Sequence, residues 1–254
     1  MKKYALITGA SRGIGKAVAC ALARRGFSLI LTASKDSTSL EETSSIVSQI
    51  YKDTFPGDSL SLYNVHTFLF DLGDSTAIDR FFEELDAAGI RENIDVLVNN
   101  AGIDLFELVQ DTTMEQWRRI MSVNADSVFY MSKKVLPAML HRHDGVIINI
   151  SSYWGIAGAA MESAYCASKG AVNAFTLSLA SELEPSGISV NALACEFIDT
   201  DMNSHLNKEE IEDALKLMPS GRVISPEEIG EACAALAAER RNVTGKILSM
   251  SDIL

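Results

Sequence analysis

The sequence predicts an α/β fold in which a doubly wound parallel sheet of about seven strands carries helices on both faces. Short runs rich in Val, Ile and Leu recur along the chain, and neighbouring positions within them are apolar, which is typical of strands buried on both faces. Longer amphipathic stretches separate these runs. The pattern indicates a parallel sheet, because strands that alternate with helices build sheets covered on both sides.

Each predicted element follows from one of these stretches. The predicted strands cover residues 4–8, 28–32, 66–70, 95–100, 145–151, 188–194 and 246–250, and the predicted helices cover 14–25, 74–88, 112–140, 163–183 and 226–240. The polar segment 34–64 lacks a strong apolar stripe and is expected to hold one helix and a surface loop. Length alone permits one domain or two, but no internal repeat or long linker divides the chain, so residues 1–254 are expected to form a single domain.

The composition excludes several kinds of partner. A net charge of −12 disfavours nucleic acid and anionic membrane surfaces, since both attract basic patches. No run approaches the roughly 18 apolar residues of a membrane span, and the apolar stretch behind Lys2 and Lys3 is too short for a signal peptide. The scattered cysteines form no CxxC pair and have no histidine at metal-ligand spacing. We therefore expect a cytoplasmic protein without a metal site.

A glycine-rich turn joins the first predicted strand to the first predicted helix. "LITGASRGIGKAV" (6–18) places Gly9, Gly13 and Gly15 there. Glycines at such a turn let the backbone approach a phosphate, and the helix N-terminus offers free N–H groups to an anion. The alternative is that they serve only a tight turn. The position after a first strand favours a dinucleotide-binding Rossmann fold.

Further motifs follow the other predicted strands. Asp71 follows the third strand, "NNAG" (99–102) the fourth and Ser152 the fifth, and Tyr165 and Lys169 form a Tyr-x3-Lys pair on the next helix. With the Gly-x3-Gly-x-Gly loop, these residues resemble the classical short-chain dehydrogenase/reductase family from residue 4 to about 250. The stretches "GASRGIG", "YCASKGAV" and "GRVISPEEIG" look most like its 3-oxoacyl-acyl-carrier-protein reductase branch.

The resemblance implies a set of cofactor-binding residues near the carboxyl ends of the predicted strands. They are Gly9, Ser11, Arg12, Gly13, Ile14, Gly15, Ser34, Lys35, Asp71, Leu72, Asn100, Ala101, Gly102, Tyr165, Lys169, Ile198 and Thr200. In the family, the residue at Asp71 contacts the adenine, and the segment after the sixth strand meets the nicotinamide.

The end of the second strand bears on the type of nicotinamide cofactor. A carboxylate there would accept the ribose hydroxyls of NAD and repel the additional phosphate of NADP. This chain has Ala33 at that position, and Arg12, Ser34 and Lys35 offer donors and positive charge nearby. NADP(H) is therefore favoured over NAD(H). Against it, Asp36 weakens the local field, and the two cations would also suit a solvated surface.

The Tyr-x3-Lys pair supplies acid–base chemistry. Tyr165 and Lys169 share one helix face, and a neighbouring ammonium stabilises a phenolate, so the pattern predicts a lowered pKa for Tyr165. The resemblance makes Tyr165 the general acid, gives Ser152 the hydrogen bond to the substrate oxygen, and lets Lys169 hold the nicotinamide ribose. Asn124 matches the fourth catalytic position, which fixes a water that connects Lys169 to solvent. Taken singly, Ser152 suits a helix cap, Asn124 a helix kink and the pair a surface contact.

Two places depart from the family pattern. After the sixth strand, Cys195-Glu196 replaces the usual Pro-Gly, and Asp252-Ile253 stands where Gly-Gly is common. A Cβ and a carboxylate at Glu196 would stand where backbone normally approaches the cofactor. We expect Glu196 and Trp154 to line the substrate pocket. The segment 196–222 is the candidate for a mobile lid.

Three functions remain open from the sequence. The first is an NADPH-dependent reductase that converts a small-molecule or carrier-bound ketone to a secondary alcohol, as in 3-oxoacyl reductases. The second is a related reductase of an aminopentanone modification on elongation factor P. The third, of another class, is a dinucleotide-binding regulatory module with little turnover because of Glu196. The resemblance also implies a homodimer or homotetramer that associates through helices 112–140 and 163–183 and the last strand.

Overall fold

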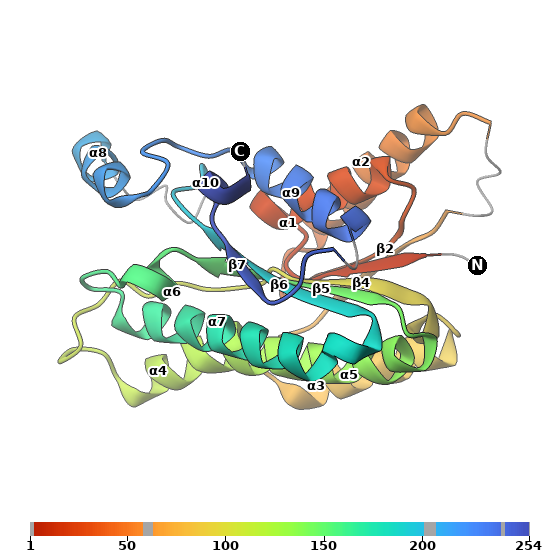
Figure 1. Cartoon of the computed structure of the whole chain (residues 1–254), viewed down its shortest axis with the longest axis horizontal. Helices are drawn as coiled ribbons and strands as arrows, with labels where there is room; N and C mark the ends of the chain where they lie inside the picture. Colours follow the sequence, from red (N-terminus) through yellow and green to blue (C-terminus); the bar gives the residue numbers. More distant parts are fainter. Residues whose placement is uncertain (1–2, 58–62, 201–206, 240–241, 254) are drawn as a thin grey trace.

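Parallel strands in the order β3-β2-β1-β4-β5-β6-β7 form the centre of the computed structural model, which describes residues 3–57, 63–200, 207–239 and 242–253 (Figure 1). Within these residues the sheet has seven strands, and every neighbouring pair is parallel. Their bounds are β1 Tyr4–Ile7, β2 Ser28–Ala33, β3 Val65–Leu69, β4 Ile94–Asn99, β5 Gly145–Ser152, β6 Ile188–Cys195 and β7 Lys246–Leu248. The predicted fold class is confirmed.

Helices cover both faces of this sheet. On one face lie α1 (Gly13–Arg24), α2 (Ser37–Thr54) and α9 (Pro226–Glu239), and on the other α3 (Ser75–Ala87), α5 (Ser127–Arg142) and α7 (Ser163–Leu183) (Figure 1). The side chains of each strand alternate between the two layers, so that Leu6 is buried on one side and Ile7 on the other. This double burial explains why the strands read as continuous apolar runs.

The sheet reverses its winding between β1 and β4, which lie side by side although β2 and β3 separate them in sequence. In open α/β sheets, ligands bind in the crevice beyond the carboxyl ends of the strands at such a switch point. The glycine loop follows β1 and "NNAG" ends β4, so the topology brings the two motifs to the same place.

The predicted helix 112–140 runs without a gap from Met114 to Arg142, but it is not a regular α-helix throughout. The structure has α4 (Met114–Met121), a π-helical turn (Ser122–Asp126) and then α5. The turn contains Asn124, whose side-chain amide bonds to a segment outside the helix, at Ile103. A π turn inserts an additional residue and is common at functional sites. Apolar spacing alone did not reveal it, because tertiary hydrogen bonds maintain the irregularity.

The C-terminal region differs from prediction in one element. β7 ends at Leu248 rather than at residue 250, and a short helix, α10 (Met250–Ile253), follows it. Asp252 explains the change: its Oδ2 accepts hydrogen bonds from the Ser249 N–H and hydroxyl, at 2.8 and 2.7 Å. Asp252, which stands where the family commonly has glycine, thus closes a helical turn.

The remaining elements are short, apart from one helix. They are two 3-10 turns (Arg91–Asn93 and Glu184–Ser186), α6 (Trp154–Ala157) and α8 (Lys208–Leu217). α8 lies inside the segment 196–222, of which residues 201–206 are outside the described part. Nowhere in the described ranges is a helix both long enough and apolar enough to span a bilayer.

Candidate active site

The glycine loop adopts a backbone path that side chains would obstruct. Gly9 and Gly13 have φ angles of +66° and +53°, which L-residues with a Cβ rarely adopt. A Cβ on Gly15 would lie 2.1 Å from the carbonyl oxygen of Gly9. Arg12, the N-cap of α1, makes no side-chain capping bond to the helix. The loop is therefore a close-fitting cradle whose helix N-terminus suits the phosphates of a dinucleotide.

Hydrogen bonds fix this loop against the end of β4. The side-chain amide of Asn100 donates to the carbonyl oxygens of Thr8 and Gly9, at 2.8 and 3.0 Å. The Thr8 hydroxyl accepts the backbone N–H groups of Asn100 and Ala101, at 2.9 and 3.0 Å. The structure thus brings the predicted loops together. Sequence reasoning missed Thr8 as the residue between them, although it directly precedes Gly9.

At the end of β2, no carboxylate occupies the position that would bind a ribose. Ala33 is buried, whereas Ser34 and Lys35 are exposed. Asp36 accepts the Ser39 N–H at 3.0 Å as the N-cap of α2, and this bond, with the nearby Arg12 charge, lowers the pKa of Asp36. The Asp36 carboxylate therefore caps a helix, and the Arg12 guanidinium lies within electrostatic range of it.

Asp71, the predicted adenine contact, already has polar partners. Its Oδ2 pairs with the Arg119 guanidinium at 2.8 Å, and its Oδ1 accepts the Gly73 N–H at 2.9 Å. Partial burial raises the pKa of Asp71, but these hydrogen bonds outweigh it and the net shift is downward. Leu72 is buried beside it. The adenine contact stays a prediction, and an adenine amine there would share an acceptor with Arg119.

Ser152, Tyr165 and Lys169 converge where β5 ends and α7 begins. The Lys169 Nζ lies 5.8 Å from the centre of the Tyr165 ring and donates to the Ile150 carbonyl at 2.9 Å. Ser152 is buried, and its hydroxyl accepts the Trp154 N–H at 3.2 Å. The fixed ends of a strand and a helix therefore hold the hydroxyl, the phenol and the ammonium within one small region.

The two central pKa values are governed by burial. Loss of hydration raises the pKa of Tyr165, and a hydrogen bond from Ser152 opposes this rise. This direction is opposite to the one that the sequence predicts, because desolvation of the phenol is the largest effect on its pKa. Burial also lowers the pKa of Lys169 to about 8. Tyr165 consequently holds its proton at neutral pH, as a proton donor must.

Asn124 is a buried hub beside this group. Its side-chain amide donates to Ile103 O at 2.8 Å and to the Ser168 hydroxyl at 3.0 Å, and its Oδ1 accepts the Ile103 N–H at 2.9 Å. Ser168 in turn donates to the backbone carbonyl of Tyr165 at 2.7 Å. Sequence reasoning missed Ser168. Asn124 therefore ties the π turn to the helix that carries Tyr165.

Gly155 permits the close packing of α6 on the backbone of Lys169, and Gly102 lies beside the lysine ammonium. A Cβ on Gly102 would lie 3.4 Å from the Lys169 Nζ and 3.5 Å from the Asn124 Oδ1, so these three residues meet. A Cβ on Gly155 would lie 2.7 Å from the Lys169 carbonyl carbon. This contact holds α6, which begins at the half-buried Trp154, against α7.

The segment after β6 packs on the glycine loop but directs its carboxylate elsewhere. The Thr200 methyl lies 3.4 Å from the position of a Cβ on Gly13. Ile198 forms a parallel bridge with Ile224. Glu196 is only 7% exposed, and its Oε2 accepts the Ser220 N–H at 2.8 Å. The structure thus places Thr200 against the cradle and Ile198 in the bridge with Ile224, while one oxygen of Glu196 binds the N–H of Ser220, near the end of the segment 196–222.

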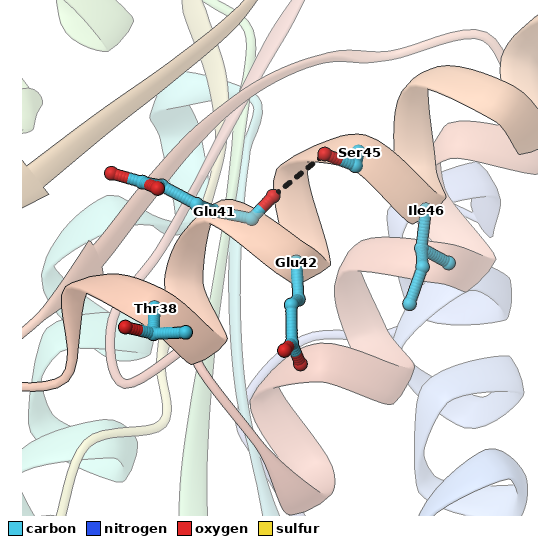
Figure 2. A pocket seen from close by; sticks show the side chains of 5 residues that line it. All are labelled: Thr38, Glu41, Glu42, Ser45 and Ile46. Carbon is cyan, nitrogen blue, oxygen red and sulfur yellow. Dashed lines mark hydrogen bonds between the residues drawn. The ribbon is translucent and has the colours of Figure 1, made fainter.

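A shallow hollow on α2 lies outside this region (Figure 2). Its lining side chains, Thr38, Glu41, Glu42, Ser45 and Ile46, all come from one helix, and the Ser45 hydroxyl donates to the Glu41 carbonyl at 3.0 Å. With no second element to enclose a ligand, we assign it no function. Among the residues with described placement, no group of three His, Cys, Asp or Glu side chains is arranged to hold a metal ion.

A doubly wound sheet, a glycine cradle at its switch point and a Ser-Tyr-Lys group beside it define a dinucleotide-dependent oxidoreductase. Comparison with known proteins agrees, since the model of the short chain dehydrogenase family matches residues 3–211. The chain belongs to the short-chain dehydrogenase family, whose members use NAD(P)(H).

Similar proteins cover nearly the whole chain. A 3-oxoacyl-acyl-carrier-protein reductase of Vibrio cholerae is 38% identical over 250 residues, covering 98% of this chain and 96% of its own. A Bacillus subtilis protein named as an uncharacterized oxidoreductase, YmfI, is 34% identical over 252 residues, covering 99% and 98%. A crystal structure of a putative gluconate dehydrogenase from Agrobacterium tumefaciens superposes with a TM-score of 0.86 at 28% identity, covering 98% and 94%.

The lowered pKa of Lys169 predicts a distinctive pH dependence of stability. Between about pH 8 and pH 10 the unfolded chain keeps a proton that folded Lys169 has released, so the free energy of unfolding gains a term that rises with pH, by at most about 1.4 kcal/mol per unit. Lys169→Met should lack this rise in urea titrations across the window. Lys52→Met, which removes an exposed ammonium, is the control and should keep the wild-type slope; equal slopes for all three proteins would contradict the assignment.

Proposed function

We propose that the protein is an NADPH-dependent reductase that converts a ketone to a secondary alcohol, with Tyr165 as general acid. The observation that carries the proposal is the convergence of Ser152, Tyr165 and Lys169 beside the glycine cradle. A reductase needs a positioned proton donor next to the bound nicotinamide, and a buried phenol that holds its proton meets that need.

The mechanism assigns one task to each residue. Bound NADPH supplies the hydride. Ser152 donates a hydrogen bond to the substrate oxygen and so orients the carbonyl, and Tyr165 transfers its proton to that oxygen. Lys169 holds the nicotinamide ribose, and Asn124 positions the water through which the proton is replaced. Such a positioned acid typically contributes about 10²- to 10⁴-fold to the rate.

The preference for NADP(H) over NAD(H) rests on the end of β2. Ala33 leaves that position without a carboxylate, and the one nearby acid, Asp36, is engaged as a helix cap. The exposed side chains of Arg12, Ser34 and Lys35 can donate to a 2′-phosphate. Because the Asp36 carboxylate accepts the Ser39 N–H as the N-cap of α2, it repels the 2′-phosphate of NADP(H) less than a free carboxylate would.

The substrate is proposed to be a carrier-bound or small 3-oxoacyl compound, as the similarity to 3-oxoacyl-acyl-carrier-protein reductases suggests. A second candidate is an amino-ketone, such as an aminopentanone on elongation factor P. One observation favours it: the carboxylates of Glu162 and Asp104 act on the Tyr165 hydroxyl electrostatically, raising its pKa further. A negative field of that kind attracts an ammonium group. The regulatory-module alternative has less support, because all four catalytic positions retain their residues.

We further propose a cytoplasmic homodimer or homotetramer. α4, α5 and α7 expose large apolar side chains, among them Met114, Trp117, Phe129 and Leu177. Phe129 and Phe175 stack edge to face at 6.0 Å, which joins α5 and α7 into one apolar surface. A second copy of the chain would remove this surface from water. The four cysteines form no disulfide, which suits a reducing compartment.

Tyr165→Phe tests the mechanism. We expect kcat for ketone reduction to fall by about 10²- to 10⁴-fold, because the proton donor is lost, while the NADPH dissociation constant changes by less than about threefold. NADPH oxidation against 3-oxoacyl thioesters, small diketones and amino-ketones measures turnover and identifies the substrate class. Tyr130→Phe removes a phenol on α5 and should remain active. Full activity in Tyr165→Phe would refute the mechanism, and tight NADPH binding without any turnover would support the regulatory module.

Arg12→Ala tests the cofactor assignment. The KM for NADPH should rise roughly tenfold, because a charge-assisted contact to the 2′-phosphate is lost, and the KM for NADH should change little. Arg24→Ala, which removes an exposed cation paired with Glu231, is the matched control. A clear preference of the wild-type protein for NADH would overturn the assignment.

The double variant Phe129→Glu, Leu177→Glu tests the proposed assembly. Two carboxylates on the apolar surface should convert a dimer or tetramer to a monomer that keeps its far-ultraviolet circular dichroism, because burying unpaired charges is costly. Light scattering measures the mass. Ile46→Glu places a charge at an exposed apolar site on α2 and should leave the assembly intact. A wild-type protein that is already monomeric contradicts the proposal.

A further inference from the structure

The first residues of the segment 196–222, here called the lid segment, lie beside Ile224, which follows the end of the segment by two positions. The Phe197 carbonyl accepts the Ile224 N–H at 2.9 Å, and the Asp199 N–H donates to the Ile224 carbonyl at 3.1 Å. These bonds flank the bridge between Ile198 and Ile224. The chain thus leaves β6 and returns toward α9 through a short parallel pairing, which forms the base of the lid segment.

Glu196 adds a side-chain bond to this base. Its carboxylate is almost fully buried, and its Oε2 accepts the Ser220 N–H at 2.8 Å across 24 positions of sequence. The other oxygen, Oε1, is buried and has no hydrogen-bond partner among the described residues. Burying a carboxylate is costly unless donors compensate it. Glycine, the residue usual in the family here, has no side chain with which to make this bond.

Among the described residues, few other contacts hold the helical part of the lid segment in place. None of the residues of α8 is buried, and Leu217 at its end is 64% exposed. Met218 is buried directly after the helix, and Arg222 is held by the carboxylate of Glu228 on α9. The bond from Glu196 therefore joins the base at Ser220, between these two anchors, and fixes the point from which α8 extends.

We propose that Glu196 is a positioning residue for the substrate, and that its carboxylate clamps Ser220 so that the return of the lid segment is held at the end of β6, where Cys195 pairs with Ser152 on β5. The inference rests on the proposed function, because a clamp at this place matters for turnover only if a ketone binds beside Ser152. It also explains what glutamate does at the position where glycine is usual in the family: its carboxylate binds the lid segment and takes no part in the hydride transfer.

Three variants test the clamp. In Glu196→Ala the ketone KM should rise roughly tenfold, the loss expected for a hydrogen bond to a charged acceptor, while kcat and the NADPH dissociation constant stay within about twofold. Glu196→Gln keeps an oxygen that accepts the Ser220 N–H and should restore most of the wild-type KM. Asp199→Ala removes an exposed carboxylate from the same segment and should resemble wild type.

Amide hydrogen exchange provides a readout that does not depend on turnover. The Ser220 N–H should lose protection in Glu196→Ala and keep it in Glu196→Gln, while the Ile224 N–H stays protected in both. Unchanged Ser220 exchange in Glu196→Ala would overturn the proposal, as would a KM defect that Glu196→Gln does not repair. If wild-type protein reduced none of the ketones, the proposed function would fail, whereas the exchange measurement would still decide whether Glu196 holds Ser220.

Discussion

The buried ammonium of Lys169 is the group around which the site is organised. It sits between the end of β5 and the first turns of α7, where the Ile150 carbonyl is its hydrogen-bond acceptor. A charge in that position is costly, so the surroundings must be tightly determined to keep it there. Gly155 allows α6 to pack against the Lys169 backbone, and Gly102 leaves space at its Nζ. A Cβ at Gly155 would overlap the Lys169 backbone, whereas a Cβ at Gly102 would meet the Nζ at an ordinary contact distance of 3.4 Å.

This arrangement also explains why Tyr165 is suited to donate a proton. The phenol is desolvated, which opposes ionisation, while the hydrogen bond from Ser152 favours the phenolate that forms as the proton leaves. Burial is the larger effect, so the phenol keeps its proton at neutral pH. Asn124 maintains the geometry because it joins Ile103, the π turn and Ser168 through side-chain bonds that a regular helix could not direct to the same place.

Most of the fold was predictable because the strands are buried on both faces and the helices are amphipathic, so both patterns are local. The cradle was predictable for the same reason: Gly9, Gly13 and Gly15 lie within seven residues of one another, and each is required by the local path of the backbone. Three features were not. The π turn at Asn124 depends on hydrogen bonds to Ile103, 21 positions away. The helical turn at Asp252 depends on the capping bond from Ser249. The raised pKa of Tyr165 depends on burial, which the spacing of residues along the chain does not reveal. The first and the third are tertiary effects, and the second depends on a local bond between Ser249 and Asp252 that the residue types permit but do not require.

Cys195 and Glu196 illustrate how a departure from a family pattern can exchange one structural device for another. Proline and glycine at a strand end restrict and free the backbone, respectively, and so set the path of the following loop through conformation alone. Here the Cys195 carbonyl accepts the Tyr153 N–H at 2.8 Å, a backbone bond that proline would also allow, and the Glu196 carboxylate accepts the Ser220 N–H, a bond that glycine cannot make. The first bond ties the loop to the residue beyond Ser152, and the second ties it to the return of the lid segment. The path of the loop therefore depends on one side-chain bond, from Glu196, in place of the conformational freedom of glycine.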